Sequence, residues 1–261
     1  MDNPERSKIT NRVLIFLIVI VAVLVLYALV TRPKKIFKVI APIKGKIAIV
    51  IDDWGYNLNN LERLKKIRYP ITASILPNLS YSKALAIELH KRNIEIILHL
   101  PMEPREKFRL EQNTIMVSMD EASIINIIDQ DLLNVPYVVG VSNHMGSKAT
   151  EDPAILKSIF NELKKRGLYF LDSFVSPKSI CAEIAGSVAL PFAKRNVFLD
   201  NEENPEYIKK QLYKLIEIAK RHGQAVGIGH DRKTTLETLK EVMPQIESQG
   251  YKFVYVSRLT R

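Results

Sequence analysis

The sequence predicts an α/β fold: a (β/α) barrel of seven or eight mostly parallel strands, preceded by one N-terminal transmembrane helix. Three observations predict it. From residue 46 onward short apolar runs alternate with longer amphipathic runs, which favours parallel strands joined by right-handed crossovers. About 215 residues carry the alternation, a usual length for such a barrel. Near the N-terminus lies an uncharged run. A doubly wound open sheet is the alternative, although no G-x-G-x-x-G follows the first strand.

The uncharged run is "VLIFLIVIVAVLVLYALV", eighteen residues from 13 to 30, near the minimum for crossing a bilayer. No small-x-small cleavage pattern follows it, so an uncleaved signal anchor is favoured over a cleaved signal peptide. Basic residues flank both sides and leave the positive-inside rule uninformative. A short tail before a large domain favours an extracytoplasmic (periplasmic or extracellular) domain. The predicted segments are a cytoplasmic tail (1–12), the anchor (13–30), a linker (31–45) and a catalytic domain (46–261).

Within this domain, eight apolar runs are expected to be strands: residues 47–51, 71–75, 94–98, 137–141, 168–171, 197–199, 224–228 and 252–256. Amphipathic spacing near 3.6 predicts helices over 81–92, 120–133, 152–166, 205–222 and 233–249. Asp152 and Asn204, each before a proline, are expected N-caps. Gly167, Gly223 and Gly250 each follow a helix, where glycine suits a left-handed turn.

The composition limits the classes of partner. The formal charge is +10, and residues 1–38 contribute half of it, with seven Lys/Arg and two Asp/Glu. The rest is spread without a basic stripe, so a nucleic-acid partner is not expected. The single Cys181 excludes an internal disulfide and a Cys-rich metal site, and is expected to be a small buried hydrophobe.

Polar residues collect where the predicted strands end. The first strand leads into "KIAIVIDDWGYN" (46–57), with two adjacent carboxylates directly after the apolar run. Because barrel active sites lie at the carboxyl ends of the strands, these residues are expected to share one rim. Each alone also fits an ordinary role, such as a helix cap, a core histidine or a turn residue. Together they favour a functional site, formed by Asp52, Asp53, His99, His144, Asp172, Asp200, His230 and Asp231.

Histidines and aspartates converging on one point suit a particular chemistry. Imidazole nitrogen and carboxylate oxygen bind zinc and similar divalent ions. Three protein ligands leave room for a water that the metal makes acidic. A second carboxylate can accept its proton, and a separate histidine can protonate a leaving group. The set therefore indicates metal-assisted hydrolysis of an amide or ester.

Five motifs, "IVIDDWG", "LHLPMEP", "SNHMGS", "FLDS" and "VGIGHDR", occur in this order at the predicted strand ends. In this combination they resemble the divergent polysaccharide deacetylase family, a branch of the metal-dependent carbohydrate deacetylases with a distorted (β/α) barrel. The resemblance covers residues 45 to 258. It implies an enzyme that removes N-acetyl groups from an envelope glycan and uses one divalent metal ion, with Zn²⁺ the expected ion.

The resemblance also implies residue roles at the metal. Asp52 matches the family's catalytic base and Asp53 its aspartate ligand. In the better studied deacetylases the second motif is His-x-x-x-His, and it is altered here, because Glu103 stands four residues after His99. We therefore expect His144 to be the third ligand. Glu103 is the alternative, either as a ligand or as a residue that holds a ligand in place.

The late histidine of the family matches His230, the expected catalytic acid. Asp172 resembles the family's strand-end aspartate and is expected to orient His230 or to contact substrate. Trp54 and Tyr56 suit stacking on a sugar ring, but they equally suit packing at the barrel rim. The substrate-binding candidates are Trp54, Tyr56, Asn143 and Asp200.

Two classes of function follow. The first is a membrane-anchored N-deacetylase or related hydrolase, and the second is a catalytically silent barrel that binds a glycan or an envelope partner. The retained Asp52 favours the enzyme, whereas the altered second motif favours the binder. A metal-independent barrel is a third interpretation. The expected partners are a glycan and, through the N-terminal helix, a membrane; the sequence predicts no oligomeric state.

Overall fold

The computed structural model describes residues 4–31 and 42–261, and the chain divides into two units, residues 1–41 and 42–261. In the first unit, Pro4–Val30 form helix α1. Over the described residues, no helix combines the length and the apolar character that a membrane crossing requires, so the predicted anchor at 13–30 is not confirmed. Residues 1–3 of the predicted tail and 32–41 of the predicted linker lie outside the described residues.

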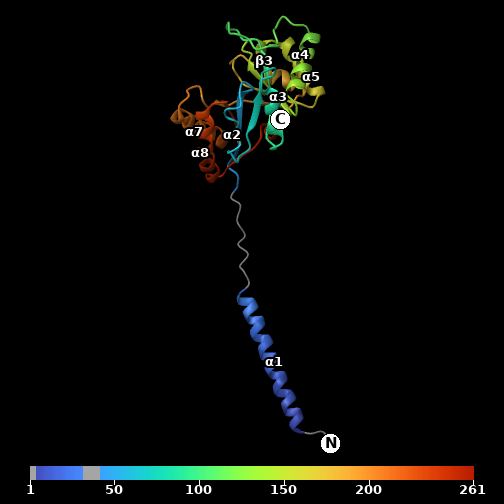
Figure 1. Ribbon diagram of the computed structural model, residues 1–261, viewed down its shortest axis with the longest axis vertical. Coiled ribbons are helices and arrows are strands. Elements are labelled where there is room, and N and C mark those ends of the chain that lie inside the picture. The colour runs from blue at the N-terminus through green and yellow to red at the C-terminus, as the bar shows by residue number, and fades with distance from the viewer. Residues whose placement is uncertain (1–3, 32–41) are drawn as a thin grey trace. The chain divides into compact units, whose positions relative to one another are not determined.

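The second unit is built on one parallel sheet (Figure 1), in the order β6-β5-β4-β3-β2-β1-β8-β7, with β9 paired to β1. Every strand pairing in it is parallel, as the alternating sequence pattern predicts. The strands are β1 (Gly45–Trp54), β2 (Thr72–Ile75), β3 (Glu95–Met102), β4 (Gly140–Met145), β5 (Tyr169–Asp172), β6 (Phe192–Lys194), β7 (Val197–Phe198), β8 (Gln224–His230) and β9 (Tyr251–Phe253).

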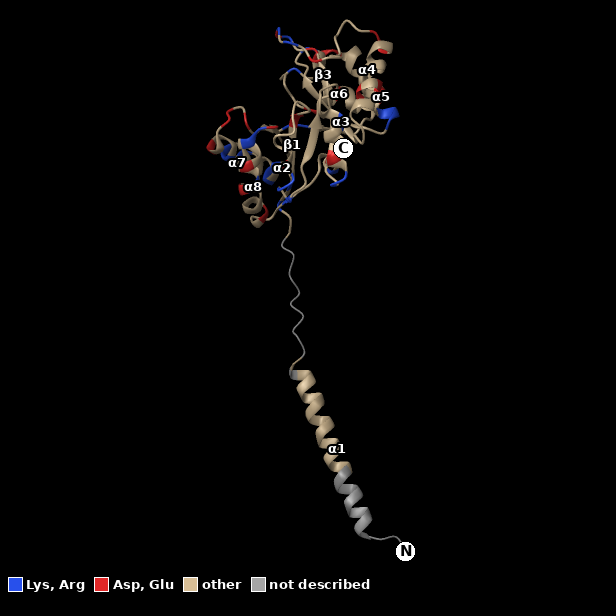
Figure 2. Cartoon of the chain, in the orientation of Figure 1, with Lys and Arg blue, Asp and Glu red and all other residues tan. Residues whose placement is uncertain are grey.

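Helices cover the outer face of this sheet. In Figure 1, α7 and α8 lie to one side and α3, α4 and α5 to the other. Lys, Arg, Asp and Glu are interspersed over these helices (Figure 2), as expected for solvent-facing surfaces. The helices are α2 (Leu61–Leu64), α3 (Ser82–His90), α4 (Glu121–Asn134), α5 (Pro153–Lys165), α6 (Cys181–Val188), α7 (Pro205–His222) and α8 (Lys233–Ser248), with 3₁₀ turns η1 (Ala149–Glu151) and η2 (Val256–Arg258).

The sheet curls until its two edge strands approach each other. β6 and β7 lie at opposite edges, yet only Arg195 and Asn196 separate them in the chain. The backbone N–H of Arg195 donates to the Asp172 carbonyl (2.9 Å), beside β6, and that of Asn196 donates to the Val226 carbonyl (2.8 Å), beside β7. The result is an irregular, curled barrel of parallel strands, the fold class that the sequence predicts.

The eight predicted strands and five predicted helices each overlap an observed element. The sequence pattern overlooks β6, α2 and α6, which are short. Asp152 and Asn204 cap α5 and α7 through side-chain oxygens that accept backbone N–H bonds, as predicted. Gly167, Gly223 and Gly250 all have positive φ, between 68° and 95°, after their helices. Cys181 is buried, as expected.

Candidate active site

Side-chain alternation directs the strand-end residues into the barrel. In β1, Ala48 and Val50 belong to the interior cluster, while the alternating Ile47, Ile49 and Ile51 pack against the helices. Successive side chains of a strand point to opposite faces, so Asp52 continues the interior row. In the same way, His99 lies two residues after Ile97 in β3, and His230 lies two residues after Ile228 in β8. Both isoleucines belong to the interior cluster. The interior strand-end residues are therefore Asp52, His99, His144 and His230.

Asp53 would point outward by this alternation, but the backbone changes its direction. It has a φ of 65°, and the pairing of β1 with β2 shifts register between Ile51 and Trp54. This irregularity brings Asp53 to the same hollow as Asp52 and places Trp54 in the helix-facing core. Trp54 is fully buried, so its predicted stacking on a sugar is wrong and the packing alternative holds.

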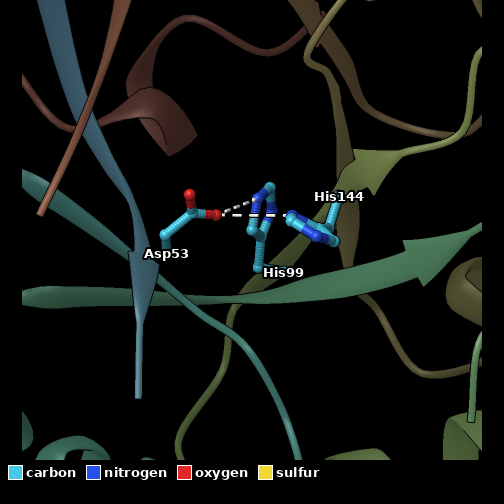
Figure 3. A group of neighbouring side chains, drawn as sticks. All are labelled: Asp53, His99 and His144. Atoms are coloured by element: carbon cyan, nitrogen blue, oxygen red, sulfur yellow. Dashed lines mark ion pairs between the residues drawn. The ribbon is translucent and has the colours of Figure 1, made fainter. Parts of the chain in front are cut away.

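Asp53, His99 and His144 converge from β1, β3 and β4 (Figure 3). The Asp53 Oδ1 atom lies 3.4 Å from His99 Nε2 and 3.3 Å from His144 Nδ1. Both separations are below twice the ~2.1 Å of a typical zinc–ligand bond, so Asp53 can share an ion with either histidine. One ligand atom from each residue lies within 4.8 Å of the others. The structure thus brings together the three predicted ligands in a possible metal site.

A hydrogen-bonded chain behind His99 holds its ring in place. The Nδ1 atom of His99 lies 2.8 Å from Ser142 Oγ, which lies 2.8 Å from Ser74 Oγ, and all three side chains are buried. With the proton on Nδ1, Nε2 presents its lone pair toward Asp53. Ser142 is not among the residues predicted for the site, although it precedes His144 by two positions on the same face of β4 and pairs in register with His99.

One buried polar atom beside the three ligands supports the metal site. Among the described residues, Asp52 Oδ1 is one of five buried side-chain atoms without a hydrogen-bond partner. His144 Nε2 is another, but the ring nitrogen that lies toward Asp53 is Nδ1. An unpaired buried polar group costs free energy unless a bound species satisfies it. An unpaired carboxylate oxygen beside the Asp53, His99 and His144 group fits the water of a divalent cation held there.

The two neighbouring aspartates have opposite pKa shifts. Burial raises the pKa of Asp52, the charge of Asp53 adds to this, and the nearby His99 and His230 oppose it. Burial alone would also raise the pKa of Asp53, but hydrogen bonds with His144 and His99 outweigh it and hold that pKa far below its ordinary value. Asp53 therefore has the properties of an ionised ligand, and Asp52 those of a carboxylate that can take up a proton.

Asp200 orients His230. Its Oδ1 lies 2.8 Å from His230 Nδ1, and its Oδ2 accepts the His230 backbone N–H (2.8 Å) and the Thr235 hydroxyl (2.6 Å). A Cβ on Gly229 would lie 2.9 Å from the Thr235 methyl and 3.4 Å from Asp200 Oδ2, so this packing favours glycine there. Asp200 is fully buried, which contradicts its predicted contact with substrate.

Asp172 has a different position from the one predicted. It lies two residues after Phe170 in β5, so the two side chains point to the same side of the strand. Phe170 packs in the helix-facing core. Its carboxylate accepts the Phe174 backbone N–H (2.7 Å) and the Ser179 hydroxyl (2.7 Å). Burial raises its pKa, and the Ser179 bond opposes this. Asp172 therefore holds the loop after β5, and the residue that contacts His230 is Asp200 instead. The alternative, contact of Asp172 with substrate, stays a prediction.

An aromatic ring supports His230 from another side. The Phe198 ring lies 6.0 Å from the His230 ring at 21°, and the Arg195 guanidinium carbon lies 3.6 Å from the centre of the Phe198 ring. Arg195 also donates to the carbonyls of Ser173 (2.6 Å) and Phe174 (2.7 Å). Neither Arg195 nor Phe198 is predicted for the site, because nothing in the sequence pattern shows that the edges of the sheet meet.

Glu103, the alternative ligand, lies outside the group of three. Its carboxylate binds Lys148 Nζ (2.6 Å) and accepts the Val117 backbone N–H (2.6 Å), so it is not grouped with the ligands. Its role in holding a ligand in place stays a prediction. Tyr56 is half-exposed and donates its hydroxyl proton to Glu111. Its role in sugar stacking stays a prediction.

Asn143 lines the hollow but is almost fully buried, and its amide group is used within the protein. Its Nδ2 donates to the Met145 carbonyl (2.7 Å), and its Oδ1 accepts the Ser173 N–H (2.8 Å). Asn143 therefore fixes two strand-end loops relative to each other, and direct contact with substrate stays a prediction.

The fold and the possible metal site are those of a deacetylase-like barrel. Residues 49–260 match the divergent polysaccharide deacetylase family, and the chain belongs to this family. The family predicted from the motifs is thereby confirmed.

The uncharacterized protein YibQ of Escherichia coli (strain K12) is 35% identical over 199 residues, 76% of this chain and 62% of YibQ. The chain thus matches somewhat under two thirds of that relative's length.

Two solved structures share the fold. The uncharacterized protein ATU2773 from Agrobacterium tumefaciens C58 superposes with a TM-score of 0.79 at 22% identity, covering 84% of this chain and 90% of that one. The catalytic domain of peptidoglycan N-acetylglucosamine deacetylase from Eubacterium rectale ATCC 33656 has a TM-score of 0.52 at 16% identity, covering 80% and 87%.

Proposed function

We propose that this protein is a zinc-dependent N-deacetylase that removes acetyl groups from an N-acetylated polysaccharide of the cell envelope. One observation carries the proposal: the Asp53, His99 and His144 group lies beside a buried carboxylate, Asp52, whose Oδ2 is 3.6 Å from His99 Nε2. Since envelope glycans lie outside the cytoplasm, the proposal includes an extracytoplasmic location for the domain.

Asp53, His99 and His144 would hold the ion. When bound, zinc polarises a carbonyl and lowers the pKa of a coordinated water. Asp52 is placed to accept the proton of that water, because its carboxylate faces the hollow and has a raised pKa. Water and the acetamide then give acetate and a free amine.

His230 is the proposed acid for the departing amine. It pairs in register with Asp52 on the adjacent strand, and both side chains line the same hollow. Burial alone would lower the pKa of His230, but the hydrogen bond and charge of Asp200 outweigh burial and raise it. A raised pKa keeps the imidazole protonated near neutral pH, so His230 can supply the proton that the leaving nitrogen needs.

Family membership supports a carbohydrate amide as the substrate class. The structural neighbour from Eubacterium rectale, a peptidoglycan N-acetylglucosamine deacetylase, is consistent with an N-acetylated sugar. A second candidate function is glycan binding without turnover. It is favoured by Glu103, which stands where the better studied deacetylases have their second histidine and which pairs with Lys148 instead of joining the metal site.

Acetate release separates the two functions. The full chain, supplied with zinc, is incubated with N-acetylated oligosaccharides, and acetate is measured. We expect release by the wild type and a loss of about 10²-fold or more in Asp52→Asn, because a general base is removed while the fold is kept. Retained glycan binding without acetate release by the wild type would instead indicate the silent binder.

A further inference from the structure

We infer that a second sugar-binding subsite lies beside the metal site and that Phe108 is its aromatic platform. The inference rests on the proposed function, since it takes the substrate to be a chain of N-acetylated sugars. It adds that the protein binds at least two adjacent sugar units and prefers an oligosaccharide to a monosaccharide.

Two hollows share a wall at this rim of the barrel. The first, about 200 Å³, contains Asp52, Asp53, His99, His144 and His230. The second, about 170 Å³, lies next to it and is lined by Pro104, Glu106, Phe108, Met145, Ser147 and Val175. Met145 and Val175 line both hollows. Each hollow is smaller than the ~300 Å³ lower limit of usual small-molecule pockets, so the pair suits a ligand that continues from one to the other.

The shared wall is held by buried hydrogen bonds. Asn143 binds the Met145 carbonyl and the Ser173 N–H through its side chain, and the Ser173 hydroxyl donates to the Asn143 carbonyl (2.9 Å). These bonds fix the end of β4 and the loop that carries Val175. The wall between the two hollows is therefore a defined part of the fold.

The loop that carries Phe108 is also attached. The Arg105 backbone N–H donates to Ser147 Oγ (2.9 Å), and that hydroxyl donates to Glu106 Oε2 (2.8 Å). The Arg105 guanidinium pairs with Glu151. Together these contacts hold the loop after β3 against the turn after β4, and Phe108 follows within three residues.

The composition of the second hollow fits a sugar ring. Phe108 is 60% exposed and Val175 36% exposed, so they present apolar surface to solvent at the edge of a polar site. A pyranose ring has an apolar C–H face, which packs on such surfaces, and hydroxyl groups at its edge. Glu106 and Ser147 supply a carboxylate and a hydroxyl for those groups. Phe108 and Val175 line the same hollow, so they form one small apolar surface and are not two isolated exposed residues.

Binding calorimetry tests the inference without turnover. N-acetylglucosamine and its β-1,4-linked trimer are each titrated into full-length Asp52→Asn protein with zinc. We expect tighter binding of the trimer. Phe108→Ala in this background should weaken trimer binding about five- to tenfold, the usual value of one aromatic contact, and leave monomer binding unchanged.

Phe108→Trp should retain trimer binding. Tyr213→Ala removes an aromatic side chain of similar exposure (51%) on α7 and should leave both affinities unchanged. Equal affinities for monomer and trimer, no binding of either, or an equal effect of Phe108→Ala on both would overturn the subsite.

Acetate release by the protein with Asp52 intact is scored separately. Trimer binding that depends on Phe108, without acetate release, would overturn the proposed deacetylase activity and support the subsite. Acetate release, with trimer binding that does not depend on Phe108, would support the deacetylase activity and overturn the subsite.

Discussion

The carboxylate of Asp200 holds the imidazole of His230 through a 2.8 Å contact from Oδ1 to Nδ1, and its other oxygen accepts the His230 backbone N–H. The carboxylate is completely buried, whereas the imidazole reaches the hollow that contains Asp52 and Asp53. Nδ1 is thus occupied, and Nε2 is the nitrogen left for proton transfer.

Asp200→Asn should shift the pH dependence of the proposed deacetylation. In the wild type the Asp200 charge raises the pKa of His230 against the lowering effect of burial. Without that charge the pKa falls, so the protonated acid is lost at lower pH and the alkaline limb of kcat/KM moves down. We expect a loss of about 10²-fold at neutral pH, measured by acetate release between pH 5 and 10. An alkaline limb that stays in place would exclude His230 as the acid, and Glu203→Gln, an exposed neighbour, is the control.

Replacing His99 and His144 together by alanine should abolish metal binding. Each contributes one nitrogen within 4.8 Å of the Asp53 carboxylate, and loss of both leaves a single protein ligand. Elemental analysis of untagged protein, after incubation with zinc and removal of the excess, should find about one zinc ion per wild-type chain and almost none in the variant. His222→Ala, an exposed histidine at the end of α7, should keep its zinc. A wild type without zinc would remove the proposed mechanism.

Ser142→Ala should weaken zinc binding without removing a ligand. The hydroxyl lies 2.8 Å from His99 Nδ1 and holds the ring with Nε2 toward Asp53. Loss of an outer-shell hydrogen bond of this kind reduces metal affinity about 10- to 100-fold. Competition with a zinc chelator measures the change. Ser248→Ala, on the exposed end of α8, is the matched control, and equal affinities in the two variants would show that the Ser142 hydroxyl is dispensable.

Asp131→Asn should stabilise the protein at neutral pH. The side chain is fully buried in α4, and burial raises its pKa to about 6 against hydrogen bonds with Asn78 and Asn113. A carboxyl whose folded pKa exceeds its unfolded value binds more protons when folded, so its contribution to stability falls as pH rises from about 4 to 6. Asparagine avoids this loss and keeps an oxygen acceptor.

Urea unfolding at several pH values measures the effect. The difference between Asp131→Asn and wild type should grow from pH 4 to 6 and stay constant above, at up to about 3 kcal/mol in free energy of unfolding. Glu121→Gln, exposed on the same helix, should show little change. A pH-independent difference for Asp131→Asn would contradict the raised pKa.

Much of the site could be predicted from strand periodicity. Asp52, His99 and His230 each lie two residues beyond an apolar residue that faces the barrel interior. Parallel strands present their carboxyl ends at one rim, so an alternating pattern is enough to bring these side chains together. The caps of α5 and α7 are equally local, because Asp152 and Asn204 bind N–H groups within three residues.

Only the tertiary structure decided the rest. The alternation of side chains along β1 does not explain why Asp53 faces the possible metal site or why Trp54 is buried. Both depend on the register shift between Ile51 and Trp54. Asp200, and not Asp172, orients His230 because β7 returns beside β8 when the sheet curls. Local pattern therefore determined which residues reach the rim, whereas long-range strand pairing determined which of them touch. The reason is that alternation is a property of a single strand, and contact depends on how distant strands are placed by the whole sheet.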